Sequence, residues 1–421
     1  MAMLIGAGLS MAEPSKLPSA WELAQSAKAK YTAQWGGTRP PLPDDIDKQA
    51  DYFFARNELQ TIYLSTLIDK HAFAARPNEG HDTIADLMLS KAVQAVVTTN
   101  VDELIEHAGH TIYGQIESAI DGISIAAFSP ETVPLLKIHG CRRIDWLNTI
   151  WCTGQLPFNP VKDRVTTGAT WIQNKFVNRD ILIIGYWTDW DYLNSVVDSA
   201  LNAVNPSRVI VVNSADAATF PEKAKSLYDL GTRATNGFYH VQVSGTEFLA
   251  GLRRMFSQRF IRIVLQSGKE DFEDQRGTPP NAAWLEPATA DNVSLWLMRR
   301  DLLGCRPNAP AESSTPPTEP LLGLTLLELQ AAGATAEGPC WRLNGSLIRV
   351  LRTPNQLLHK AEAMYDGDLA PVVASDFVVA VGAQSTALPP SIARGGGTAS
   401  IARTSGSTWL SYGDAKAEFG L

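Results

Sequence analysis

The sequence predicts an α/β protein: a doubly wound, Rossmann-like parallel sheet with an inserted helical module, followed by a smaller C-terminal α+β domain. Short runs rich in Val and Ile alternate with helical patterns over the first three-fifths of the chain. These runs are apolar at consecutive positions, as strands covered on both faces are. The pattern changes after about residue 262, where proline-rich and glycine-rich stretches appear.

Six apolar runs are the expected strands of the first domain, and helical patterns lie between them. The runs are Ala2–Ile5, Val93–Thr98, Val133–Ile138, Asp180–Gly185, Arg208–Asn213 and Phe238–Val243. Helices are expected over Trp21–Lys30, Glu222–Leu230 and Glu247–Phe256, the last with Thr246 as its cap.

One long interval interrupts the alternation of strands and helices. Between the first and second runs there is no strand pattern, and Ile46–Asp69 reads as one helix because large apolar residues recur every three or four positions. We therefore expect a helical insert over about residues 31–90, packed over the carboxyl edge of the sheet. The first domain is expected to span residues 1–262 and the second residues 263–421.

The C-terminal part carries no catalytic signature, and interaction or assembly is its expected role. Gly304–Pro320 is rich in proline and predicts an extended linker. Leu321–Ala332 predicts a helix, Ser346–Arg352 and Asp376–Val381 predict strands, and Ala387–Ser407 predicts a loop.

The composition is that of an ordinary globular protein of more than one domain. The 421 residues carry 36 Lys and Arg against 44 Asp and Glu, a formal charge of −8, which disfavours nucleic-acid binding through bulk charge. The apolar runs have the length of strands and not of membrane spans, and the N-terminus does not read as a signal peptide. We expect a cytoplasmic protein that does not enter a membrane.

The cysteines do not predict a metal site. Cys141, Cys152, Cys305 and Cys340 form no CxxC pair and no cluster with histidine. They are expected to be buried thiols in a reducing compartment.

The first strand runs into a glycine turn, Gly6-Ala7-Gly8-Leu9-Ser10. Glycines at this place let the backbone turn tightly and approach a phosphate, with N–H groups directed at the anion. The alternative is a tight turn with no ligand. A dehydrogenase fingerprint is disfavoured, because a third glycine and an acidic residue after the next strand are both missing.

Polar residues or glycines also follow the later strands, where ligands bind in open α/β sheets. Asn100 and Asp102 follow the second run, and His139, within Lys137–Gly140, follows the third. A histidine that titrates near neutrality could move a proton at cellular pH. Gly185 and Asn213 end the fourth and fifth runs. The alternatives are a helix cap for Asn100, a structural role for His139 and turn chemistry for the other two.

Taken in order, these five motifs resemble those of the sirtuin superfamily over about residues 1–260. The resemblance implies that the sheet binds NAD and that its nicotinamide–ribose bond is broken. It implies pyrophosphate contacts for Gly6, Ala7, Gly8 and Ser10, and places Asn100 and Asp102 beside the nicotinamide ribose and the attacking water. His139 would be the general base, Gly185 would line the adenosine side, and Asn213 would reach the adenine ribose.

Two departures separate this chain from the protein-deacylating sirtuins. The chain reads Ser15–Trp21 where they carry Gly-Ile-Pro-Asp-Phe-Arg, and it offers no four-cysteine zinc module. The Leu17–Ala24 pattern, the helical insert and the Gly185–Asn194 stretch instead resemble the sirtuin-like effectors of prokaryotic antiphage defence, in which water replaces acyl-lysine and NAD is consumed. That resemblance implies an NAD hydrolase, a homo-oligomer, and a HerA-type translocase or a short Argonaute as partner, with no metal.

Two other functions stay open on the sequence. One is a protein deacylase or ADP-ribosyltransferase on the same fold. The other is a non-catalytic subunit that senses NAD or ADP-ribose, although such a subunit would not need a base at His139.

Overall fold

The computed structural model describes residues 1–186, 191–214, 216–287, 290–304, 313–365, 373–385 and 407–421. The chain divides into two compact units. Unit 1 comprises residues 1–111 and 115–250, and unit 2 comprises residues 112–114 and 251–421. Much of the predicted Gly304–Pro320 linker, nearly all of the predicted Ala387–Ser407 loop and residues 187–190 lie outside the described residues.

Unit 1 is built on a seven-stranded sheet in the order β3-β4-β2-β1-β5-β6-β7, in which every neighbouring pair is parallel. This confirms the predicted doubly wound fold. The strands are β1 (Ala2–Ile5), β2 (Ala95–Thr98), β3 (Ser118–Ala119), β4 (Leu135–Lys137), β5 (Asp180–Ile184), β6 (Arg208–Val212) and β7 (Phe238–Val241). All six predicted runs form strands, and only the two-residue edge strand β3 was not predicted.

Helices cover the sheet because its strands are apolar on both faces. On one face, Leu4, Val97 and Ile183 belong to a buried cluster with residues of the surrounding helices. The helices of unit 1 are α1 (Ala20–Trp35), α2 (Ile46–Phe54), α3 (Glu79–Leu89), α4 (Leu104–Thr111), α5 (Gly122–Ala126), α6 (Val161–Phe176), α7 (Asp191–Leu201), α8 (Phe220–Lys223) and α9 (Lys225–Thr232). The helix α10 (Gly245–Ser267) begins in unit 1 and runs into unit 2.

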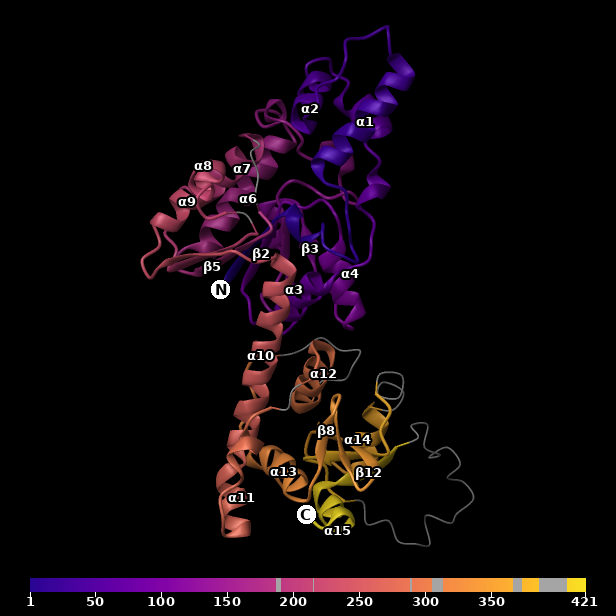
Figure 1. Ribbon diagram of the computed structural model, residues 1–421, viewed down its shortest axis with the longest axis vertical. Coiled ribbons are helices and arrows are strands. Elements are labelled where there is room, and N and C mark those ends of the chain that lie inside the picture. Colours follow the sequence, from indigo (N-terminus) through magenta and orange to yellow (C-terminus); the bar gives the residue numbers. More distant parts are fainter. Residues whose placement is uncertain (187–190, 215, 288–289, 305–312, 366–372, 386–406) are drawn as a thin grey trace. The chain divides into compact units, whose positions relative to one another are not determined.

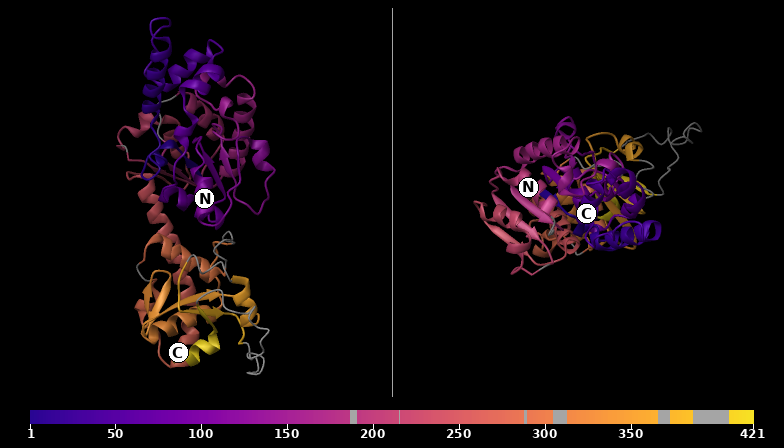
Figure 2. Two further views of the ribbon diagram at one scale, coloured as in Figure 1. Left: turned by 90° about the vertical axis from the view of Figure 1, so that its right-hand side faces the viewer. Right: turned by 90° about the horizontal axis from the view of Figure 1, so that it is seen from above.

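The insert after β1 has a core of its own. The insert includes α1, α2, a π-helix over Leu59–Leu67 and a short 3-10 helix over Lys70–Phe73. Helices α1 and α2 lie at one end of unit 1, beyond the sheet (Figures 1 and 2). The apolar faces of α1, α2 and the π-helix pack on one another around Tyr31, Phe53 and Tyr63. The ring of Phe53 stacks on that of Tyr63 and meets that of Tyr31 edge to face.

Three local predictions were wrong. The single helix expected over Ile46–Asp69 is interrupted at Asn57, which takes a left-handed conformation with φ of 59°. The helix expected over Glu222–Leu230 is split at Ala224, whose backbone leaves the helical region. At the start of α10 the side chain of Ser244, and not Thr246, accepts the Glu247 N–H, at 3.2 Å.

Unit 2 contains a five-stranded mixed sheet in the order β12-β11-β10-β9-β8. Its strands are β8 (Thr335–Glu337), β9 (Cys340–Leu343), β10 (Ser346–Arg352), β11 (Phe377–Val381) and β12 (Thr408–Ser411). Its helices are α11 (Lys269–Arg276), α12 (Asn292–Leu303), α13 (Pro320–Ala331), α14 (Leu358–Tyr365) and α15 (Tyr412–Phe419). This confirms the smaller C-terminal α+β domain, with β10, β11 and α13 close to where the sequence predicts them.

A buried ion pair lies in the core of unit 2. The Arg349 guanidinium on β10 donates two hydrogen bonds to the Asp301 carboxylate on α12, at 2.6 and 2.7 Å. Both side chains are almost fully buried, so each charge depends on the other.

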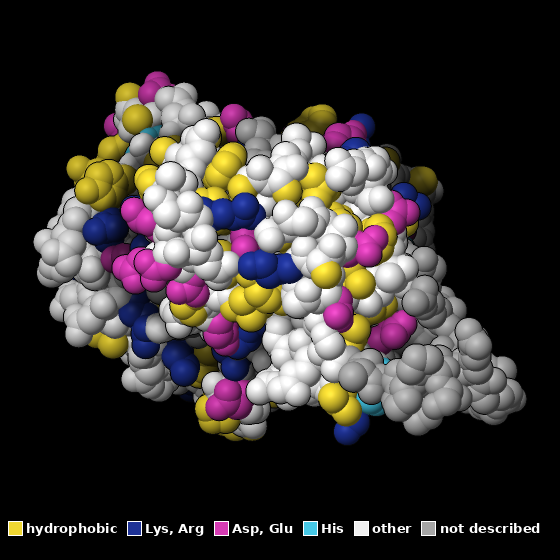
Figure 3. All heavy atoms as spheres, turned by 90° about the horizontal axis from the view of Figure 1, so that it is seen from below, with side chains coloured by type: hydrophobic (Ala, Val, Ile, Leu, Met, Phe, Trp, Pro, Cys, Tyr) yellow, Lys and Arg dark blue, Asp and Glu magenta, His cyan; other side chains and the backbone are white. Residues whose placement is uncertain are grey.

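On the face of the molecule shown in Figure 3, acidic and basic side chains are interspersed, and neither sign forms a continuous charged patch.

No helix in the described part of the chain is both long and apolar enough to cross a membrane.

The strand order reverses between β1 and β5, and the turns that follow these two strands pack directly on each other. Counted along the chain without β3, the order is the 3-2-1-4-5-6 order of dinucleotide-binding sheets, whose ligands bind at this reversal. The N–H groups of Gly6 and Gly8 donate to the carbonyls of Ile184 and Gly185, at 2.8 and 2.9 Å. Gly185 has φ of 65°, and a Cβ there would lie 2.6 Å from the Leu9 nitrogen.

We predict that Gly185→Ala destabilises unit 1 far more than Gly37→Ala does. Both glycines have positive φ, but a Cβ at Gly37 would meet nothing within 4 Å. Gly37→Ala should therefore lower the free energy of unfolding by only about 1 kcal/mol, the cost of holding an alanine in the left-handed conformation. Gly185→Ala should lower it by about 3 kcal/mol, because the two turns must also separate. Urea unfolding monitored by intrinsic fluorescence measures both. Equal losses would contradict the packing of the two turns.

Candidate functional site

A cavity of about 570 Å³ opens at the reversal point of the sheet. This volume lies within the range of small-molecule sites. The turns after β1, β2, β5 and β6 and the start of α10 line one part of it, together with His139, and apolar residues of the insert line another. Of the predicted site residues, Ala7, Gly8, Ser10, Asn100, Asp102, His139, Gly185 and Asn213 line this one cavity.

Gly6 is the predicted site residue that does not line the cavity. A Cβ at this position would lie 2.5 Å from the Gly185 carbonyl oxygen, so the packing of β1 against β5 already requires glycine here. The N–H groups of Gly6, Gly8, Leu9 and Ser10 all donate to carbonyls within the protein. These four N–H groups are therefore engaged within the protein, and the pyrophosphate contacts expected of Gly6, Ala7, Gly8 and Ser10 stay a prediction.

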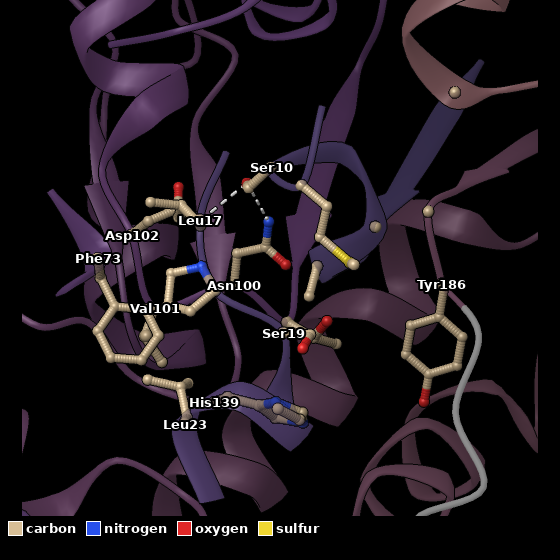
Figure 4. A pocket seen from close by; sticks show the side chains of 18 of the residues that line it. Ser10, Leu17, Ser19, Leu23, Phe73, Asn100, Val101, Asp102, His139 and Tyr186 are labelled. Carbon is tan, nitrogen blue, oxygen red and sulfur yellow. Dashed lines mark hydrogen bonds between the residues drawn. The ribbon is translucent and has the colours of Figure 1, made fainter. Parts of the chain in front are cut away.

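Ser10 is the centre of a buried hydrogen-bond network at the edge of the cavity, and Figure 4 shows its bonds to Asn100 and Asp102. Its hydroxyl lies 3.0 Å from Asp102 Oδ2, 3.1 Å from Asn100 Nδ2 and 3.1 Å from His81 Nε2. An amide nitrogen can only donate and a carboxylate can only accept, so Ser10 accepts from Asn100 and donates its one proton to Asp102.

This network orients the Asn100 side chain. Its nitrogen faces Ser10, and its oxygen faces the opposite way (Figure 4). Asn100 is only 7% exposed, and its Oδ1 has no hydrogen-bond partner among the residues that the structure describes. A buried carbonyl oxygen without a partner costs free energy unless a ligand or water satisfies it. Asn100 lines the cavity, and its side-chain oxygen is a buried acceptor on the side of the amide that faces away from Ser10.

Asp102 is held from both sides. Its Oδ2 accepts from Ser10 and its Oδ1 accepts from the N–H of Leu104, at 3.1 Å, near the start of α4. The buried Lys137 ammonium donates to the Asp102 backbone carbonyl and lies 2.9 Å from Glu106 Oε1. The carboxylate is thus fixed at the edge of the cavity.

His139 follows β4 and is 3% exposed. Burial lowers the pKa of its imidazole to about 3, although a hydrogen bond to the Thr99 backbone favours protonation. The expected titration near neutrality was therefore wrong: the ring is neutral at cellular pH. When one nitrogen of a neutral imidazole donates to a carbonyl, the other carries the acceptor lone pair.

An arginine anchors the loop that carries His139. Arg164 on α6 donates to the Asn148 carbonyl and pairs with Asp145, both at 2.7 Å. A Cβ at Gly140, which has φ of 101°, would lie 2.9 Å from the Arg164 guanidinium. The residue after His139 therefore has to be glycine.

Two features bear on which ligand the cavity can hold. No lysine or arginine belongs to its lining within the described residues, so an anionic ligand would be held by N–H groups. Ser244 and Gly245, at the N-terminal and electropositive end of α10, line the cavity and provide such an environment. In the same part of the chain, no group of three or more His, Cys, Asp or Glu residues could hold a metal ion.

Comparison with known proteins gives matches only among solved structures. No family model and no curated protein matches the chain. A structure described as the basis of sirtuin substrate affinity is 16% identical, with a TM-score of 0.30, and covers 60% of this chain and 92% of its own. Sir2Tm bound to a propionylated peptide is 14% identical, with a TM-score of 0.31 and the same coverage. A mutant Sir2 homologue in complex with ADP-ribose is 18% identical, with a TM-score of 0.30, and covers 60% and 90%.

The sequence patterns missed His81. It lies inside the helical insert, at the third position of α3, yet its ring reaches Ser10. The available signal was Asn78 followed three residues later by His81, the spacing of a capping box.

We predict that the protein loses stability as pH falls from about 6.5 toward 4. Burial lowers the pKa of His81 to about 4 and that of His139 to about 3, whereas an unfolded chain titrates near 6.5. Below that pH the unfolded state binds more protons, so each histidine should cost about 1.4 kcal/mol per pH unit. Urea unfolding from pH 7 to 4.5 measures the slope. An unchanged slope in His139→Asn would contradict the buried neutral state.

Proposed function

We propose that this protein is an NAD hydrolase that cleaves the nicotinamide–ribose bond to give nicotinamide and ADP-ribose. The observation that carries the proposal is the pairing of an acceptor oxygen on Asn100, fixed by a buried network, with the neutral imidazole of His139 in one cavity at the reversal point of the sheet. NAD is proposed as the nucleotide because the order of the motifs along the chain resembles that of the sirtuins.

The reaction breaks the C1′–N bond of NAD⁺, and nicotinamide leaves with the bonding electron pair as a neutral molecule. Water forms the new bond to C1′ and loses one proton. Positive charge develops on the ribose, and in a buried site a fixed dipole or carboxylate stabilises such charge strongly. Asn100 Oδ1 would face this ribose and the attacking water, with Asp102 nearby.

His139 would take the proton. A neutral imidazole is in the correct form to accept it at cellular pH. Its low pKa makes it a weak base, and a cationic or partly positive substrate would not raise that pKa. We therefore assign His139 a modest share of the acceleration, as the base that accepts the proton from the water directly or by way of a ribose hydroxyl.

The rest of the nucleotide would lie along the turns after β1, β5 and β6. Ala7, Gly8 and the start of α10 would face the diphosphate, Gly185 the adenosine side and Asn213 the adenine ribose. Three protein groups already occupy the hydrogen-bonding positions of the Ser10 hydroxyl. We therefore propose that Ser10 holds Asn100 and Asp102 in place and does not contact the diphosphate.

We further propose that the enzyme depletes NAD as an effector of prokaryotic antiphage defence, in the cytoplasm. Its activity would be controlled by self-assembly or by a HerA-type or short-Argonaute partner through residues 263–421. This part of the proposal is supported by the resemblance of the sequence to such effectors.

The first test is nicotinamide release from NAD by the full chain, without any peptide. Asn100→Ala and His139→Ala should each lower the rate, the former by about a hundredfold to a thousandfold and the latter by at least tenfold. Chromatography of nicotinamide and ADP-ribose measures this. The exposed residues Asn202 and His110 give matched controls, since Asn202→Ala and His110→Ala should change nothing.

Two results would overturn the assignment. Parent rates in both cavity variants would show that the chemistry occurs elsewhere. Nicotinamide release that strictly requires an acyl-lysine peptide would identify a deacylase.

The second test is the pH dependence of kcat/KM, which reports the ionisations of the free enzyme. Because burial lowers the pKa of His139 to about 3, no acid limb should appear between pH 5 and 8. An unperturbed histidine would instead halve the rate near pH 6.5. An acid limb near 6.5 that disappears in His139→Asn would contradict the buried neutral ring.

A further inference from the structure

His81 occupies a position where a capping box normally carries glutamate or glutamine. Asn78 is the N-cap of α3, and its side-chain oxygen accepts from the N–H groups of Gly80 and His81, at 3.0 and 3.3 Å. In return, the Asn78 N–H donates to His81 Nδ1, at 3.1 Å. A capping box needs only an acceptor at this position, which a carboxylate or amide oxygen would provide.

Histidine adds a second function on the other edge of its ring. A backbone N–H can only donate, so Nδ1 must be unprotonated, and a neutral ring then carries its proton on Nε2. Burial lowers the pKa of His81 to about 4, against the opposing effect of the Asp102 carboxylate, so the ring is neutral at cellular pH. Nε2 lies 3.1 Å from Ser10 Oγ and therefore donates to it.

This donor completes the bonding capacity of Ser10. The hydroxyl has two lone pairs and one proton. His81 and Asn100 supply protons to the two lone pairs, and Asp102 receives the one proton. With all three sites assigned, the hydroxyl has one orientation, and the Asn100 amide that bonds to it has one as well.

The same helix end also fixes the backbone beside Ser10. The Asn78 Nδ2 donates to the Leu9 carbonyl, at 2.8 Å, and a Cβ at Gly80 would lie 2.6 Å from Leu9 Cδ1. The beginning of α3 thus contacts the turn after β1 through both main chain and side chain.

We propose that His81 is a positioning residue for the reaction at this site: it fixes the Ser10 hydroxyl, and through it the direction in which Asn100 presents its side-chain oxygen. The inference rests on the proposed NAD hydrolysis, because it names a residue that prepares the same site. Without the His81 donor, the Ser10 hydroxyl can rotate and the Asn100 amide can turn its nitrogen toward the cavity, where a donor faces a developing positive charge.

A double-mutant cycle tests whether His81 acts through Ser10. His81→Leu and Ser10→Ala should each lower kcat for nicotinamide release by about tenfold to a hundredfold, as expected for a displaced catalytic group. The double variant should be no slower than the slower single variant, since both remove one shared effect. Multiplied losses, or an unchanged kcat in His81→Leu, would overturn the proposal.

A rescue variant separates positioning from capping. Glutamine is an ordinary capping-box residue and can also donate to Ser10, whereas leucine can do neither. His81→Gln should therefore recover most of the kcat lost in His81→Leu. His110 lies exposed on α4, so His110→Gln and His110→Leu are matched controls that should keep the parent rate. If His81→Gln recovers the thermal stability but none of the kcat, a purely structural role is indicated and the proposal fails.

The tautomer gives a readout that does not depend on NAD turnover. In the full chain with ¹⁵N-labelled histidine, the His81 resonances, assigned by their loss in His81→Gln, should show a neutral ring protonated at Nε2 from pH 5.5 to 8. A ring protonated at Nδ1, or a cationic ring, would overturn the inference. A parent protein that keeps this tautomer but releases no nicotinamide would overturn the proposed function alone.

Discussion

The site depends on the bonding capacity of one hydroxyl group. Ser10 has one proton to give and two lone pairs to share, and three side chains take all of them: His81 on α3, and Asn100 and Asp102 in the segment after β2. Two of those side chains, Asn100 and Asp102, reach the cavity, while the third, His81, does not line it. A fully satisfied buried network of this kind has a single arrangement, and a partly satisfied one does not. The direction of the Asn100 oxygen follows from that constraint.

The close packing of the turns after β1 and β5 fixes the position of the backbone that carries Ser10. Gly6, Gly8 and Gly185 let the two turns touch without side chains between them. Ser10 follows this contact after one further residue, so its position is set by the sheet. Glycine is thus required at these places by the protein's own packing, whether or not a phosphate binds there.

Much of the fold could be predicted from the sequence because buried parallel strands are continuous apolar runs. Ala2–Ile5, Asp180–Ile184 and Arg208–Val212 are strands almost to the residue. The break at Asn57 was not predictable, because a left-handed residue in an otherwise helical pattern depends on the packing around it. The residues that meet at the cavity could be predicted from their places at strand ends, but His81 could not, because its contact with Ser10 spans 71 positions of the chain. The pKa of His139 was also out of reach, since it depends on burial and not on sequence neighbours.

We propose that Asn100 offers its oxygen to the ribose while Ser10 stays within the protein network. A crystal structure of the full chain with bound ADP-ribose tests it most directly. We expect Asn100 Oδ1 to lie within hydrogen-bond distance of a hydroxyl of the terminal ribose or of a water beside C1′, with Ser10 still bonded to His81, Asn100 and Asp102. A ligand phosphate bonded to Ser10 Oγ, or an Asn100 amide nitrogen facing the ribose, would contradict it.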